Sequence, residues 1–122
     1  MQPIDREAVQ TQLSRLAGQE LYLHLETSSG AYAALSDRKA PTVAAFVRNT
    51  RLCYTRGTVS GTGPFQVGLK LDHGWAYAQG LTHWLLDSQG RLLLAGHDEN
   101  GALLVALQLS PTPFAEGGVA RG

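Results

Sequence analysis

The sequence predicts a mainly β protein of the α+β class: an antiparallel meander of about seven or eight strands, curled into a barrel or sandwich and covered by one N-terminal helix. Three observations lead to this prediction. A stretch near the N-terminus has helical spacing, the period changes to two from Glu20 onward, and turn residues then recur at short intervals. With 122 residues, the chain has room for a single hydrophobic core.

Residues 5–17 are predicted to form the helix. Asp5 is a residue type that caps helices through its carboxylate, and Gly18 supplies the left-handed stop. Val9, Leu13 and Leu16 fall on one stripe, so the helix is expected to cover one face of a sheet.

Alternation between apolar and polar residues predicts the first long strand after Glu20. Its two faces would carry Leu21, Leu23 and Leu25 on one side and Tyr22, His24 and Glu26 on the other. Further strands are expected at 31–35, at 43–47 and 52–59 around a hairpin tip at 48–51, and at 65–71 and 75–81.

Two similar turns organise the last third of the chain. Asp87 with Gly90, and Asp98 with Gly101, have the spacing of tight turns between antiparallel strands. They predict a meander of strands at 85–86, 91–96 and 103–109. Because leucines are consecutive in the last two, both faces need cover, from the helix or from a second subunit, and we expect a homodimer.

The amino-acid composition limits the partners and the cellular location that we expect for this protein. Ten basic and ten acidic residues balance, and no stretch is long and apolar enough for a membrane helix, so we expect neither nucleic acid nor membrane as partner. The N-terminus lacks a signal-peptide pattern, and one cysteine, Cys53, cannot form an intrachain disulfide. A cytoplasmic location is therefore expected.

Cys53 is interpreted as a small buried residue, with a redox role as the alternative.

The candidate metal or acid–base residues are His24, Glu26, His97 and Asp98. The spacing of two puts His24 and Glu26 on one strand face, where His97 from another strand could join them. We expect the protein to hold no resident cofactor. If these four residues do form a metal site, zinc is the metal that they would hold. In the alternative interpretation, His24 and Glu26 belong to a polar outer face and Asp98 is only a turn residue.

Positive charge is concentrated between residues 38 and 71, where six Lys and Arg occur without any Asp or Glu. The candidate residues for binding an anion or a partner are Arg48, Arg51, Arg56 and Lys70. The alternative is a solvated hairpin whose arginines point in different directions. Nearby, Trp75 and Tyr77 share a strand face opposite Ala76, Ala78 and Gly80, a pattern that core packing explains as well as a pocket does.

Several separate stretches, in this order, resemble the YojF-like family of small bacterial proteins: residues 24–34, 63–65, 67–70, 74–78, 80–82 and 90–98. The resemblance covers residues 1–114 as one domain and leaves 115–122 as a flexible tail. It implies a role beside a zinc-dependent deacetylase of bacillithiol synthesis, in low-molecular-weight thiol metabolism, and implies no catalytic residue.

Together these observations favour a non-enzymatic binding or accessory protein that acts with a metabolic enzyme of that kind. The alternatives are a metal-dependent hydrolase built on the four candidate ligands and a purely structural dimer.

Overall fold

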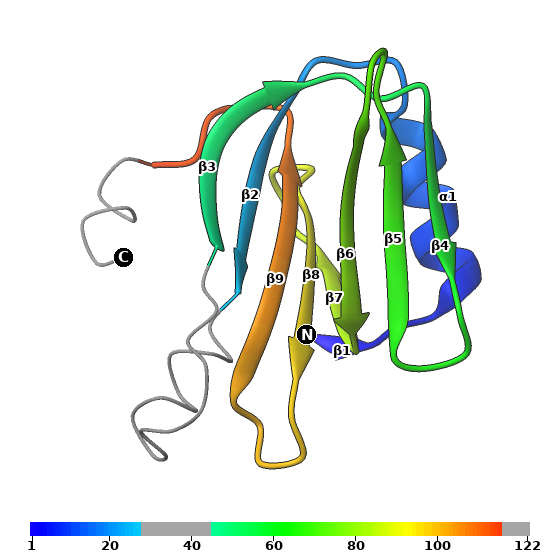
Figure 1. The fold of residues 1–122 in the computed structure, drawn as a ribbon, viewed down its shortest axis with the longest axis vertical. Coiled ribbons are helices and arrows are strands. Elements are labelled where there is room, and N and C mark those ends of the chain that lie inside the picture. The colour runs from blue at the N-terminus through cyan, green and yellow to red at the C-terminus, as the bar shows by residue number, and fades with distance from the viewer. Residues whose placement is uncertain (28–44, 116–122) are drawn as a thin grey trace.

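The computed structural model describes residues 1–27 and 45–115, which form two antiparallel sheets and one helix. A six-stranded sheet has the order β1-β7-β8-β9-β2-β3, and a three-stranded sheet has the order β4-β5-β6 (Figure 1). The sheets pack as an open sandwich, and the predicted mainly β, α+β class is confirmed. The predicted strand at 31–35 and residues 116–122 of the predicted tail lie outside the described residues.

The bounds of the elements are β1 Gln2–Pro3, α1 Arg6–Leu16, β2 Leu21–Thr27, β3 Ala45–Leu52, β4 Arg56–Ser60, β5 Phe65–Lys70, β6 Trp75–Leu81, β7 His83–Leu86, β8 Leu92–His97 and β9 Leu103–Ser110. Strand β1 is too short for a sequence signal and pairs with the edge of β7.

Helix α1 begins and ends as predicted. The Asp5 carboxylate accepts a hydrogen bond from the Ala8 backbone N–H, and Gly18 adopts a φ of 80°. The helix lies beside β4, where the Gln10 amide donates to the Gly57 carbonyl and accepts from the Val59 N–H. Gln10 therefore takes the place of a further strand along the outer edge of β4. Figure 1 shows α1 beside this strand.

The predicted meander in the last third is confirmed. Strands β7, β8 and β9 pair in succession, and the two turns close through bonds from Gly90 N–H to the Asp87 carbonyl and from Gly101 N–H to the Asp98 carbonyl. Both glycines have positive φ. Helix α1 lies beside β4, and its buried Val9 and Leu13 belong to the same core as Leu92 and Leu94 of β8.

The predicted hairpin tip at 48–51 is wrong. Strand β3 continues through these residues and pairs with β2, with a register shift where Leu23 opposes Thr50 and His24 opposes Arg48. Asn49 is the extra residue of this bulge and has a φ of 60°. Asparagine tolerates this positive φ in a bulge as readily as in a turn. The sequence therefore indicated an unusual backbone conformation near Asn49 correctly, but this conformation occurs inside a strand.

The chain crosses from the smaller sheet to the larger one between β6 and β7. Gly80 has a φ of 78°, and the Thr82 N–H then donates to the Ala95 carbonyl of β8. A Cβ atom placed on Gly96 would lie 2.0 Å from the Gly80 carbonyl oxygen, so the two backbones touch here. The core fills the space between the sheets with apolar side chains from α1 and from both sheets.

Candidate binding face

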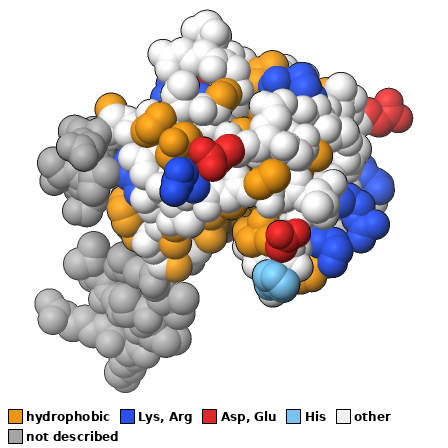
Figure 2. Space-filling view, turned by 90° about the horizontal axis from the view of Figure 1, so that it is seen from above, with side chains coloured by type: hydrophobic (Ala, Val, Ile, Leu, Met, Phe, Trp, Pro, Cys, Tyr) orange, Lys and Arg blue, Asp and Glu red, His pale blue; other side chains and the backbone are white. Residues whose placement is uncertain are grey.

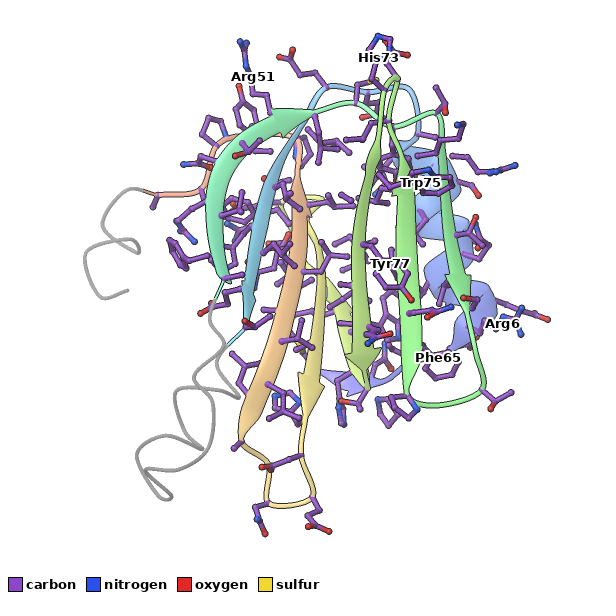
Figure 3. The ribbon with its side chains drawn as sticks, in the orientation of Figure 1. Arg6, Arg51, Phe65, His73, Trp75 and Tyr77 are labelled. Carbon is purple, nitrogen blue, oxygen red and sulfur yellow. The ribbon has the colours of Figure 1, made fainter. Side chains whose placement is uncertain are left out.

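Pleating separates the two sides of the three-stranded sheet. Gly57, Val59, Val67, Leu69 and Ala78 point inward and are buried. Trp75 and Tyr77, at alternate positions of β6, point outward and are 59% and 52% exposed. Figure 3 shows them one after the other along β6 on the open face of this sheet.

The register places basic residues beside these rings. Arg56, Lys70 and Trp75 are directly opposite one another across the three strands, and the Lys70 Nζ lies 5.3 Å from the centre of the Trp75 ring. In the next row, Gly68 lies opposite Tyr77, and a Cβ atom there would be 3.7–3.8 Å from the Trp75 and Tyr77 rings. Both aromatic rings therefore lie next to the Gly68 backbone, where that residue has no side chain.

Two amides complete this surface. The Tyr77 hydroxyl donates a hydrogen bond to the Gln66 Oε1 and lies 3.4 Å from the Gln79 Oε1. The aromatic, basic and amide side chains of this outer surface, all exposed except the half-buried Gln66, are together called the aromatic–basic face: Arg56, Gln66, Lys70, Trp75, Tyr77 and Gln79.

An apolar cleft of about 560 Å³ opens next to this face. It lies between β6 and the neighbouring part of the larger sheet, and its walls include Leu25, Ala78 and Val105. Tyr77 and Gln79 belong to both the cleft and the aromatic–basic face. The face and the cleft are therefore continuous and present aromatic, apolar and cationic groups to one ligand or partner.

The four predicted basic residues are divided between the two sheets. Arg56 and Lys70 are cross-strand neighbours on the aromatic–basic face. Arg48 and Arg51 lie on β3, where the exposed Arg51 is 3.8 Å from the Glu20 carboxylate. Basic side chains form separate groups rather than one patch in Figure 2.

Residues His24 and Glu26 are brought together as predicted, with 2.8 Å between Nε2 and Oε1. Arg48 Nη1 lies 3.2 Å from the His24 Nδ1, and because a guanidinium only donates, the His24 proton sits on Nε2. His24 is only 4% exposed, and the Phe46 and Phe114 rings both lie against its ring. The alternative interpretation placed both residues on a polar outer face, and it is wrong for His24, which is buried. Glu26 is partly exposed.

The other two predicted ligands lie elsewhere. His97 contacts His83, and Asp98 Oδ1 accepts the Asn100 and Ala102 N–H groups in its turn. Along the strands, His24 opposes Gln108 of β9, whereas His97 opposes Leu103. Residues 1–27 and 45–115 contain no group of three or more His, Cys, Asp or Glu side chains that could hold a metal ion, so the four candidates do not form one site.

Sequence reasoning placed Trp75 and Tyr77 on one face but could not tell that this face was exposed. The available signal was the opposite side of β6, where Ala76 and Ala78 are small enough to pack inward. Cys53 is exposed, so its interpretation as a buried residue is wrong.

Within the described part of the chain, the helix is too short and too polar to cross a bilayer.

Comparison with known proteins identifies relatives without a described activity. A protein family of unknown function, DUF1806, matches residues 3–114. The uncharacterized protein YojF of Bacillus subtilis (strain 168) is 45% identical over 114 residues, which cover 93% of this chain and 98% of that protein. The crystal structure of Bacillus subtilis YojF matches with a TM-score of 0.78 at 40% identity, over 93% of this chain and 96% of that one. The resemblance expected from the separate sequence stretches is thereby confirmed, and the chain belongs to the DUF1806 family.

Proposed function

We propose that this protein is a non-enzymatic accessory protein of low-molecular-weight thiol metabolism that binds a negatively charged partner through its aromatic–basic face. The observation that carries the proposal is the exposure of Trp75 and Tyr77 beside Arg56 and Lys70 on one regular sheet. Trp, Tyr and Arg are the residue types that contribute most to protein–protein binding energy.

The exposure of the two rings supports binding over a purely structural role. Both rings lie mainly in water, although each could bury a large apolar area against a partner. Each ring has only two side-chain torsions, so little side-chain entropy is lost when a partner covers it.

Charge selects the class of partner. The aromatic–basic face carries two cations, Arg56 and Lys70, and none of its side chains is acidic. A partner that lies on the aromatic–basic face therefore needs an acidic surface. The family resemblance names the candidate, the zinc-dependent deacetylase of bacillithiol synthesis.

The experiment measures binding of the purified chain to purified deacetylase at low and high salt. We expect a complex that weakens as salt screens the two surfaces. Trp75→Ala should weaken the complex by about thirtyfold, as expected for a central aromatic contact worth about 2 kcal/mol.

The control is Arg6→Glu, a charge reversal on the exposed surface of α1. It should leave binding unchanged, whereas Lys70→Glu should slow association. If no complex forms at low salt, the proposed partner is wrong. If Arg6→Glu and Lys70→Glu weaken binding equally, the aromatic–basic face is not the binding surface.

A further inference from the structure

A pair of histidines lies on the six-stranded sheet, apart from the aromatic–basic face. His83 of β7 and His97 of β8 have their Nδ1 atoms 3.4 Å apart, and their rings meet edge to face with centroids 5.2 Å apart. We propose that His83 and His97 form a binding site for a divalent transition-metal ion of the zinc class.

The backbone explains why the two rings meet. His83 opposes Ala95 across the strand pair, and the register is irregular between Gly96 and His97. The irregularity occurs where the Gly80 backbone touches Gly96. The crossing of the chain between the two sheets therefore fixes the backbone position of His97. The meeting of the two rings does not depend on flexible side chains alone.

Thr82 holds both residues in this arrangement. Its hydroxyl oxygen accepts the His97 backbone N–H at 3.1 Å and lies 2.7 Å from the His83 Nδ1. Thr82 thus fixes the backbone position of His97. Its contact with the His83 Nδ1 uses the nitrogen that would bind the ion, so this contact is exchanged for the metal when the ion binds.

The spacing of the nitrogen atoms matches a metal site. Zinc binds histidine nitrogen at about 2.0–2.1 Å in tetrahedral geometry, which separates two nitrogen ligands by about 3.3–3.4 Å. The observed separation of 3.4 Å is therefore the one that two nitrogens bound to a single ion would have. For both nitrogens to bind, each ring must carry its remaining proton on Nε2.

The site would leave coordination positions open. Both histidines are half-buried, so an ion can reach them from solvent. Since the described residues offer no third His, Cys, Asp or Glu ligand in a group with them, water or an added small ligand would complete the coordination. We therefore expect weaker binding than at a closed four-ligand structural site.

The test is calorimetric titration of the tag-free protein with zinc chloride. We expect saturable binding of one zinc ion per chain, and His83→Ala and His97→Ala should each weaken it by about tenfold or more. The matched control is His73→Ala, because His73 is exposed in the turn between β5 and β6. Absence of saturable binding, unchanged affinity in His83→Ala and His97→Ala, or equal loss in His73→Ala would overturn the proposal.

A second measurement needs no variant. The chain has four histidines, and NMR follows the ring signals of each during the zinc titration. The signals of His83 and His97 should shift together, while those of His24 and His73 should not. A shift confined to His24 or His73 would show that zinc binds elsewhere and would contradict the proposed site.

Discussion

Asn49 and Phe114 exchange two hydrogen bonds between the side-chain amide of one and the backbone of the other. The Asn49 Nδ2 donates to the Phe114 carbonyl at 3.0 Å, and the Phe114 N–H donates to the Asn49 Oδ1 at 2.7 Å. The β3 bulge thus holds the segment after β9 and keeps the Phe114 ring over His24, with the Arg48 guanidinium 5.1 Å from the ring centre.

Replacement of Asn49 should weaken this attachment. Asn49→Ala removes both bonds and puts an alanine at a φ of 60°, so we expect a loss of about 2–4 kcal/mol in the free energy of unfolding. Urea denaturation measures the change. The control Asn49→Gly keeps the backbone conformation and removes only the amide, so it should cost about 1–3 kcal/mol. An equal loss in both variants would mean that backbone conformation contributes nothing.

Gln10 should stabilise the edge of the smaller sheet. Gln10→Ala leaves the Gly57 carbonyl and the Val59 N–H without their side-chain partner, and we expect a loss of about 1–3 kcal/mol. Amide hydrogen exchange at Val59 should also become faster. Gln12→Ala removes only an exposed bond to Arg15 and serves as the control. Unchanged exchange at Val59 would contradict the role given to Gln10.

Gly96 should tolerate no side chain. In Gly96→Ala the new Cβ would meet the Gly80 carbonyl oxygen and a Val105 methyl, and neither sheet can yield without losing its pairing. We expect a loss above about 4 kcal/mol, enough to leave much of the protein unfolded at 25 °C. The control Gly74→Ala has no heavy atom within 4 Å of the new Cβ. Circular dichroism melting curves compare the two, and similar curves would refute the close approach.

Asp87 should make stability depend on acid pH. Burial alone raises the pKa of Asp87, but hydrogen bonds from the Arg91 backbone and side chain and from the Gln89 N–H outweigh it, so the pKa is lowered. The folded state then binds the Asp87 proton more weakly than the unfolded state does. The stabilisation is complete above the pKa of the unfolded chain, about 4, and is lost as pH falls through the lower folded pKa.

The difference in unfolding free energy between the protein and Asp87→Asn should therefore shrink as pH falls below about 4. Urea denaturation at a series of pH values measures it. The exposed Glu99, changed to Gln, provides the comparison for a general charge effect. A difference that stays constant from pH 7 to 2 would contradict the lowered pKa.

Local signals predicted much of the fold because they act over a few residues. The Asp5 cap and the two Asp–Gly turns each depend on bonds within about four positions, and the Gly18 stop depends on the positive φ of that residue itself. Asn49 shows where this reasoning ends. Its side chain and positive φ suit a turn or a bulge, and only the pairing of β3 with β2 on both sides decided for the bulge.

The candidate sites depended more strongly on tertiary structure. Alternation alone determined that Trp75 and Tyr77 share a face and that His24 and Glu26 share another, because neighbours in a pleated strand point to opposite sides. Whether each face meets water was decided by distant segments. Phe46 of β3 and Phe114, from the far end of the described chain, lie against the buried His24, whereas the described residues leave Trp75 and Tyr77 largely exposed. The His83–His97 pair likewise arose from the approach of Gly80 to Gly96, since burial and proximity depend on contacts between segments that no local pattern encodes.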